Sequence, residues 1–511
     1  MSKTVITAIY YAVIVGLFYL DRRPRERTGA GLWVAFAWLF FVLSKSPAAW
    51  MQSGPKEYDG SYNLESNPLN LILYSAIIVC GVIVLAARPN QVGKCLRANW
   101  PILLFFGYCL LSCVWSDYTL EVSKKWVRCL GDPITILIIL TEIEPATALK
   151  RLYARLGFVL LPLSVLYIKY YPEIGRAYSN SWEYMFRGVC DHKNTLGAVC
   201  CMLGLGFLWR FLDHWQNKAA PRSRRYLLAD GTMLVTTVWL LWTADSATSK
   251  VCFVTGALTL LACWVAMVRR RRWALHLIVL ALVSVPIYAA YFDRQLVGNV
   301  GRNPTLTGRT DLWQQCLQIA GNPLVGTGFE SFWLGWRIQR IWDENKGIRL
   351  NEAHNGYLEV YLQLGWCGVA LLAVVLAATY PKLVRGLRSD FSLPGLMLAY
   401  LIAALNFNHS ESDFRVQYSV WVFLLLAIMA APSWAKTAGT RLRDEIRIKD
   451  KAFAASDRGN FWGETSRSDW VESAAPSIGE AICLVKERKP GLGEMTVSQL
   501  WTKRQNRQAL P

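Results

Sequence analysis

Long apolar segments alternate with short polar ones along most of this 511-residue chain. Leu69 to Ala87 and Val251 to Val268, for example, contain no charged side chain. A helix needs about 20 residues to cross the roughly 30 Å hydrocarbon core of a bilayer. Because backbone groups in lipid must be hydrogen-bonded within the protein, helices are the expected form. The pattern therefore predicts an all-α, polytopic integral membrane protein with about 12–13 transmembrane helices and a helical exterior loop, which is a periplasmic loop if the membrane is a bacterial inner membrane.

The candidate spans lie near residues 4–20, 30–47, 69–87, 100–116, 126–141, 152–170, 195–212, 226–243, 249–268, 273–292, 356–380, 393–408 and 416–432. The segment 126–141 is the weakest of them, because it contains Arg128, Asp132 and Pro133. Asp230 makes the segment 226–243 a second candidate for irregular structure.

Basic residues cluster between the apolar segments, so the formal net charge of +19 does not indicate nucleic-acid binding. The positive-inside rule places such loops in the cytoplasm. Strict alternation then places the loops 48–68, 171–194, 293–355 and 409–415 outside. Residues 1–432 are predicted to form the membrane domain, and the polar tail 433–511 is expected to be cytoplasmic and largely disordered. The clusters that set this orientation are Arg22, Arg23, Arg25 and Arg27; Arg222, Arg224 and Arg225; and Arg269 to Arg272.

The exterior loop 293–355 has an internal apolar pattern of its own. A helix over Thr310 to Ala320, with Thr310 or Asp311 as N-cap, would place its apolar residues on one face. A second amphipathic stretch contains Phe332, Trp333 and Trp336. The loop is therefore predicted to fold as a packed cap at the membrane surface. The residues on the predicted face of the first helix are Leu312, Trp313, Cys316, Ile319 and Ala320.

Two residues of this loop have side chains suited to anion binding or to general base catalysis. Arg309 lies just before the predicted helix, whose N-terminus attracts anions, and a guanidinium offers a planar pair of donors for phosphate. An ordinary surface salt bridge is the alternative. His354 directly precedes the span that begins at Gly356, where the helix dipole favours neutral imidazole. Such a histidine is suited to act as a general base near pH 7, or simply to cap the helix.

Polar and charged residues also lie at two other exterior helix ends. One such group precedes the span near Thr195, and His409 with Glu411 lies at another. The sequence contains no phosphate-binding glycine loop, no zinc motif and no exterior aspartate cluster, so no metal or cofactor is predicted. The group before Thr195 comprises Arg187, His192, Lys193 and Asn194.

The stretches GRTDLWQQCLQIAGNPLVGTGFESFW and EAHNGYLEVYLQLGWCGVALL resemble the signature region of the O-antigen ligase and O-antigen polymerase superfamily. The segments HKNTLG and SATSK, at residues 192–197 and 246–250, are similar to its exopolysaccharide-polymerase-like branch. The resemblance covers about residues 180–430. It implies a lipid-linked glycosyltransferase of the bacterial inner membrane, with its active site facing the periplasm.

The family's donor is a glycan on undecaprenyl pyrophosphate, transferred with inversion and without metal. Carried onto this sequence, the resemblance implies that His354 removes the acceptor's proton. It implies that Arg309 and Arg187 hold the pyrophosphate, a role that Lys193 could share with Arg187. The residues expected to contribute to substrate binding are His192, Lys193, Asn194, Asn355 and Glu411.

Three functions remain open at this point. The first is polymerisation of the lipid-linked repeats into an extracellular polysaccharide or O-antigen. The second is the ligase reaction, which transfers the glycan to lipid A-core. The third, of a different class, is a polysaccharide or lipid transporter or flippase, which ionisable residues within apolar spans would favour; Asp230 and Asp245 keep it open. All three imply contact with membrane lipid and none with nucleic acid.

Overall fold

The computed structural model describes residues 2–22, 28–51, 67–178, 184–216, 223–265, 267–268, 271–292, 307–345, 348–387 and 390–430. These residues belong to one compact unit, Met1–Arg441. The predicted polar tail, and residues 293–306 of the predicted exterior loop, lie outside the described residues.

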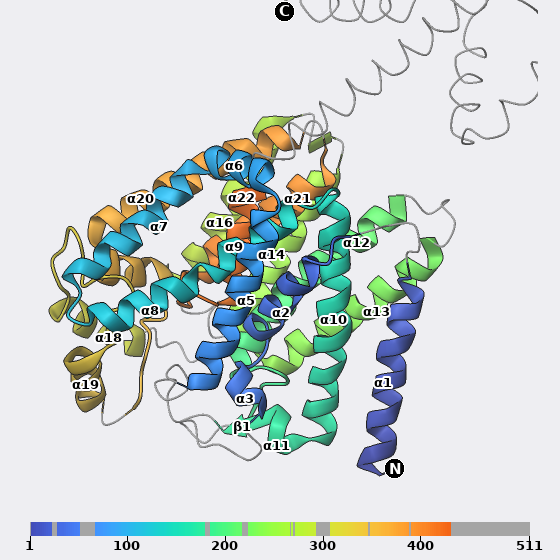
Figure 1. Cartoon of the computed structure of the whole chain (residues 1–511), viewed down its shortest axis with the longest axis horizontal. Helices are drawn as coiled ribbons and strands as arrows, with labels where there is room; N and C mark the ends of the chain where they lie inside the picture. Colours follow the sequence, from blue (N-terminus) through green and yellow to red (C-terminus); the bar gives the residue numbers. More distant parts are fainter. Residues whose placement is uncertain are drawn as a thin grey trace, which may run out of the picture. The chain divides into compact units, whose positions relative to one another are not determined.

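Each predicted span overlaps a helix in the structure, and Figure 1 shows how these helices are arranged. These helices are α1 (Lys3–Leu20), α2 (Leu32–Val42), α5 (Pro68–Ala86), α7 (Trp100–Ser112), α9 (Gly131–Leu140), α10 (Pro145–Tyr170), α12 (Lys193–Gln216), α13 (Ser223–Ala244), α14 (Ala247–Trp264), α16 (Arg272–Phe292), α20 (Gly356–Gly386), α21 (Ser392–Phe407) and α22 (Ser419–Ala430). Shorter elements join them: α3 (Pro47–Met51), α6 (Pro89–Ala98), the 3-10 helix η1 (Cys113–Trp115), α8 (Thr119–Cys129), α11 (Pro172–Gly175), α18 (Thr307–Gln318) and α19 (Gly335–Glu344). Two short strands, β1 (Arg176–Tyr178) and β2 (Tyr184–Phe186), pair antiparallel.

The predicted all-α, polytopic membrane architecture is confirmed, although fewer helices than the expected 12–13 reach full spanning length. Among the described residues, seven helices are long and apolar enough to cross a membrane. The bent pair α6 and α7 would make an eighth. The weak segment 126–141 divides between α8 and α9, where buried Asp132 accepts a hydrogen bond from the Trp38 indole at 2.8 Å. The segment around Asp230 is a regular part of α13.

The centre of the bundle is built from α12, α21 and α22, whose side chains are largely buried. The helix α14 buries one face and exposes Val254 and Leu258 on the other. Every described residue of α22 is buried, which its uninterrupted apolar sequence explains. By contrast, α1 and α5 expose most of their apolar side chains. Such faces suit contact with lipid.

The cap predicted in the exterior loop is packed around an apolar core of its own. Leu312 and Cys316 of α18, and Ile319 just after it, are buried together with Phe332 and other apolar residues. The first helix begins at Thr307, earlier than predicted, so Arg309 lies in its first turn and not before it. In the second stretch Trp336 is exposed, while its predicted partners Phe332 and Trp333 are buried.

The cap is joined to a break in α20. Gly365 interrupts this helix with a φ of 63°, and the backbone groups freed there bond to the turn 322–328 of the cap. The two backbone segments come so close that only glycine fits at the contact. A Cβ on Gly326 would lie 2.4 Å from the Gln363 carbonyl carbon, and one on Gly365 would lie 2.3 Å from the Leu324 carbonyl carbon. The backbone bonds run from Thr327 N to Leu362 O (3.1 Å), Gly328 N to Gln363 O (2.8 Å), Trp366 N to Pro323 O (2.9 Å) and Cys367 N to Leu324 O (3.0 Å).

Candidate active site

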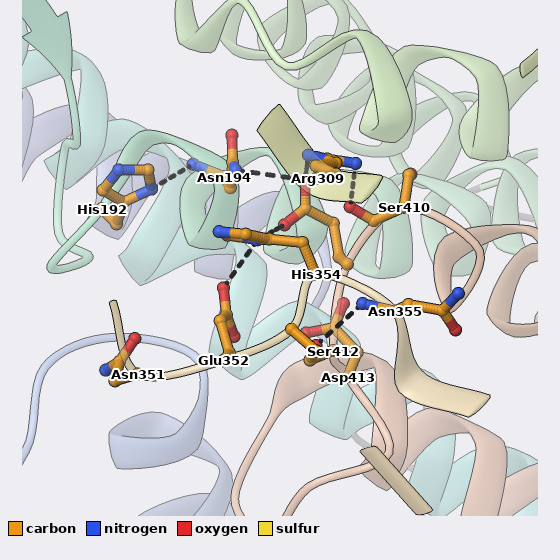
Figure 2. A network of polar contacts seen from close by, with 12 residues as sticks. His192, Asn194, Arg309, Asn351, Glu352, His354, Asn355, Ser410, Ser412 and Asp413 are labelled. Carbon is orange, nitrogen blue, oxygen red and sulfur yellow. Dashed lines mark hydrogen bonds and ion pairs between the residues drawn. The ribbon is translucent and has the colours of Figure 1, made fainter. Parts of the chain in front are cut away.

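His354 lies directly before α20, between two carboxylates (Figure 2). Its Nδ1 atom is 3.0 Å from Glu352 Oε1 and 3.4 Å from Glu411 Oε2. The His354 backbone has a φ of 50°, a left-handed conformation that costs about 1–3 kcal/mol when a side chain is present. A strained backbone thus presents the imidazole to both carboxylates, an arrangement typical of functional sites.

The expected bias of His354 towards the neutral form is wrong. Burial does lower the pKa of His354, but the Glu352 and Glu411 carboxylates outweigh it and raise this pKa to about 10. The same contact lowers the pKa of Glu352 against the opposing effect of its burial. Two adjacent carboxylates stabilise imidazolium more than a helix N-terminus destabilises it. Without substrate, His354 is therefore a cation near neutral pH.

Glu411 connects three elements of the site. Its Oε1 atom accepts a hydrogen bond from the Asn194 side chain at 3.2 Å and lies 3.9 Å from Arg309 Nη2, while its Oε2 atom faces His354. Arg309 also donates from Nη1 to the Ser410 carbonyl at 2.9 Å. We call Glu352, His354, Glu411, Arg309 and Asn194 the His354 network. It brings together residues that lie more than 200 positions apart in the sequence.

The α20 N-terminus holds the loop that carries Glu411. The Gly356 amide donates to the carbonyls of Asn408 and Glu411 at 2.9 and 3.0 Å. Asn355 is the N-cap of α20, and its Oδ1 atom accepts from the two amides of Tyr357 and Leu358. The Asn355 side chain therefore has a structural role, and its part in substrate binding stays a prediction.

His192 and Lys193 lie where α12 begins, next to the His354 network. The His192 Nδ1 atom accepts from the Asn194 amide at 3.2 Å. Burial lowers the pKa of His192, although the nearby Glu411 and Glu352 carboxylates oppose this shift. His192 is thus the neutral imidazole of the site. Lys193 acts electrostatically on His192 from the same helix end.

Arg187 belongs to a different group of contacts. Its Nε atom donates to the Ile174 carbonyl at 3.0 Å, and its charged neighbours are Asp191 and Lys45. Among the described contacts, none joins Arg187 to His354 or Arg309. The three residues predicted to be catalytic therefore divide into one pair and one separate arginine.

Sequence reasoning missed Glu352 and Arg415. Arg415 is buried, with Nη2 at 3.5 Å from Glu330 Oε2 and Nη1 at 3.8 Å from Glu352 Oε2. Glu330 and Gln417, like His354, have positive φ values. The position of Glu352 two residues before His354, and the dense polar run 408–417, were the available signals.

Glu352, His354 and Glu411 could each offer one ligand atom to a metal ion, because these atoms lie within 4.8 Å of one another. However, Arg309 faces Glu411 and Arg415 faces Glu352. These guanidinium groups would repel a divalent cation and attract an anion. The surrounding charge therefore suits an anionic ligand better than a metal.

The chain is similar to known proteins of one family. The O-antigen ligase family profile matches residues 231–373, which include Arg309, Glu352 and His354. A similar relative is the exopolysaccharide production protein ExoQ of Rhizobium meliloti (strain 1021), 28% identical over 341 residues, 63% of this chain and 75% of the relative. The chain is similar to the O-antigen ligase and polymerase-like family. The resemblance seen in the sequence is thereby confirmed.

A second family relative is the putative polysaccharide ligase of Rickettsia bellii (strain RML369-C). It is 22% identical over 446 residues, 82% of this chain and 98% of the relative. The family resemblance and the helical architecture together support a multi-pass membrane protein of the glycan-processing type. Arg187 and Glu411 lie outside the matched profile, so their assignment rests on the structure and on the sequence pattern.

Proposed function

We propose that the protein polymerises undecaprenyl-pyrophosphate-linked oligosaccharide repeats into an extracellular polysaccharide or O-antigen, at the periplasmic face of the inner membrane. The observation that supports this proposal most strongly is the His354 network. In it, His354 lies between the Glu352 and Glu411 carboxylates, and Arg309 faces the same buried Glu411. The relative named as an exopolysaccharide production protein supports the polymerase reaction. The basic loops on the opposite side of the predicted spans support the orientation.

In the proposed reaction, a hydroxyl oxygen of the acceptor sugar attacks the anomeric carbon of the donor. The bond between that carbon and the pyrophosphate oxygen breaks, and the configuration inverts. The hydroxyl proton moves to the imidazole of His354, and the pyrophosphate leaves as an anion. Arg309 is suited to bind the leaving group, because a guanidinium offers two parallel donors to phosphate. Stabilising the developing charge lowers the barrier without a metal.

Glu352 has a distinct role in this scheme. A carboxylate 3.0 Å from His354 Nδ1 favours the tautomer that carries its proton on Nδ1, which leaves Nε2 free to accept one. It also stabilises the imidazolium that forms when the acceptor's proton arrives. The raised pKa of His354 means that the base form is scarce at neutral pH and becomes more abundant as the pH rises.

The ligase reaction is the second candidate, supported by the relative named as a putative polysaccharide ligase. Both reactions use the same donor chemistry and differ in the acceptor. An assay that supplies the donor with either a lipid-linked repeat or lipid A-core separates them. A ladder of lengthening glycans supports the polymerase, and a single transfer to lipid A-core supports the ligase.

The transporter alternative loses its main support. Asp230 bonds to Arg210 at 2.8 Å and to His214 at 2.9 Å, and Asp245 pairs with Lys250 at 2.7 Å at an exposed helix end. Both aspartates therefore have local partners, which accounts for Asp230 within α13, and Asp245 lies outside the spans, between α13 and α14.

The test is transfer by purified protein supplied with undecaprenyl-pyrophosphate glycan and an acceptor. His354→Ala is expected to abolish transfer, because it removes the proton acceptor, while the protein still folds and binds donor. Donor binding and thermal unfolding serve as controls. Undiminished transfer by this variant would rule out the mechanism.

A further inference from the structure

Arg415 lies beside the His354 network, and its side chain is 11% exposed and loosely bonded. Its Nη2 atom is 3.5 Å from Glu330 Oε2, and its Nη1 atom is 3.8 Å from Glu352 Oε2 and 3.4 Å from the Asn351 carbonyl. The Nε atom is buried, and no described residue accepts a hydrogen bond from it. An unused buried donor costs about 1–3 kcal/mol. The pairing with carboxylates therefore explains the Nη atoms but not Nε.

Asp413, two residues earlier in the chain, has a buried oxygen in the same condition. The residue is 7% exposed, and no described residue donates a hydrogen bond to its Oδ2 atom. Burial raises the pKa of Asp413 well above its ordinary value, and the charges of Glu411 and Glu352 raise it further, although Arg415 opposes them. The carboxyl therefore favours its protonated form, which both donates and accepts hydrogen bonds.

The backbone around Arg415 has two strained positions. Glu330 and Gln417 have φ values of 52° and 61°, which cost about 1–3 kcal/mol each when a side chain is present. The buried Nε2 atom of Gln417 is also without a partner among the described residues. Strained backbone and unused buried polar atoms are both typical of places where a protein holds a ligand.

The charge at Arg415 is balanced, which indicates the chemistry of such a ligand. Glu330 and Glu352 each face one of its Nη atoms, so its free Nε–H offers a directed bond and not a spare charge. A neutral hydroxyl suits this donor better than a phosphate does.

Glu352 connects this group directly to His354. Its Oε2 atom faces Arg415, while its Oε1 atom lies 3.0 Å from His354 Nδ1. Figure 2 shows Asp413 and Glu352 beside His354. The His354 side chain is 28% exposed, so the unused atoms lie deeper than the imidazole but next to it.

We propose that Asp413 and Arg415 bind hydroxyl groups of a neutral sugar ring in the acceptor glycan. A sugar hydroxyl both donates and accepts, so it matches the Arg415 Nε–H group and the Asp413 carboxyl alike. A ring held by these atoms lies next to Glu352, where another of its hydroxyls can face His354. The hydroxyl chemistry follows from the unused atoms, and the acceptor role rests on the proposed function.

Binding of simple glycosides to the full-length protein in phosphatidylcholine nanodiscs, followed by saturation-transfer NMR, tests this site. The probes are the methyl glycosides of glucose, galactose and mannose. At least one should bind, and Asp413→Ala and Arg415→Lys should each weaken its binding about tenfold, because a buried hydrogen bond to the ligand is lost. The lysine keeps a positive charge beside Glu330 and Glu352 but lacks the Nε–H group.

Arg337→Lys is the matched control. The Arg337 side chain is also 11% exposed, and its buried Nε atom also has no partner among the described residues. It pairs instead with Asp117, at 2.7 Å, and no described contact joins it to Arg415 or Asp413. Glycoside binding by this variant should stay within about twofold of the unchanged protein.

Three results would overturn the proposal. The first is unchanged binding in Asp413→Ala and Arg415→Lys. The second is an equal loss in Arg337→Lys. The third is a failure of all three glycosides to bind, because water alone would then satisfy the unused atoms. Asp413→Ala removes none of the described side-chain hydrogen bonds, so its unfolding midpoint should stay near that of the unchanged protein. If one variant does not fold, the other decides.

Monodeoxy analogues of the bound glycoside locate the contact without any substitution. Loss of the hydroxyl that Arg415 binds should weaken binding to the unchanged protein about tenfold, and should make no further difference in Arg415→Lys. Equal binding of every analogue to the unchanged protein would overturn the site, because no single hydroxyl would then be recognised.

Turnover distinguishes this proposal from the proposed function. If the unchanged protein transfers glycan, Asp413→Ala should raise the acceptor KM about tenfold and leave the donor KM unchanged. An unchanged acceptor KM, or a rise in the donor KM alone, would contradict the acceptor site but leave the transferase intact. If the unchanged protein transfers no glycan from any donor, but both variants still weaken glycoside binding, the proposed function fails and the sugar site stands.

Discussion

One helix, α12, carries parts of two buried ion networks that differ in character. Asn194 in its first turn belongs to the His354 network, and Arg210 lies 16 residues later, about 24 Å along the axis. Arg210 pairs with Asp230 and Asp21, each at 2.8 Å, and donates to the Lys150 carbonyl. Its side chain is completely buried. We call Arg210, Asp21, Asp230 and His214 the Arg210 network.

The His354 network is looser. Its longest contacts are 3.4 and 3.9 Å, and the side chains of His354 and Arg309 are 28% and 25% exposed. It also includes a strained backbone, which is absent from the helical Arg210 network as described. A closed network with short bonds holds helices together, whereas an accessible one with unused bonding capacity is able to accept a ligand. We therefore expect substitutions in the Arg210 network to lower stability and substitutions in the His354 network to lower activity.

The largest expected effect is on stability, in the Arg210 network. Asp230→Ala would leave a buried guanidinium with one carboxylate, which should cost about 3–5 kcal/mol. Unfolding in detergent, followed by circular dichroism, measures this loss. Transfer per folded molecule should stay near normal. A variant that folds normally but loses transfer would contradict the division between the networks.

Arg309→Lys should show the opposite pattern. A lysine keeps the charge but not the planar pair of donors, so transfer should fall roughly 100-fold, or about 2.7 kcal/mol of transition-state stabilisation. Thermal unfolding should barely change. Full transfer by the lysine variant would show that a point charge suffices at this position.

Asn355→Ala is expected to have the smallest effect. Loss of the N-cap should cost about 1 kcal/mol of stability, with transfer reduced no more than that loss explains. The unfolding midpoint measures the loss of stability, and the transfer rate with the donor KM measures the effect on activity. A KM that rises while stability is unchanged would instead support the predicted substrate-binding role of Asn355.

Much of the helical fold was predictable because apolar segments report directly on burial or lipid contact. The cap was predictable for the same reason, since Leu312 and Cys316 recur on one helical face. The breaks were harder to find. The interruption of α20 at Gly365 depends on backbone bonds to a turn about 40 residues earlier, a pairing that no local pattern records.

The candidate site was predictable in its components but not in its electrostatics. His354 and Arg309 come together on Glu411, as their positions at helix ends suggested. The protonation of His354 was mispredicted, because the sequence shows neither the 3.0 Å contact of its neighbour Glu352 nor the approach of Glu411 from another loop. The same reason applies to Arg187, because neither its hydrogen bond to the Ile174 carbonyl nor the nearby charge of Asp191 could be placed from the sequence.

The pH dependence of transfer tests the central role of His354 most directly. Because Glu352 and Glu411 raise the pKa of His354 to about 10, the neutral base is lost as the pH falls below that value. The transfer rate should therefore rise between pH 7 and 10 in the unchanged protein. Glu352→Gln removes the main charge that raises this pKa, so the rise should move to lower pH, with a maximum lower by roughly tenfold, a part of what general base catalysis contributes. A control, Glu173→Gln, alters an exposed carboxylate and should leave the profile unchanged. A rate that falls as the pH rises through this range would contradict the account, because His354 would then act in its protonated form.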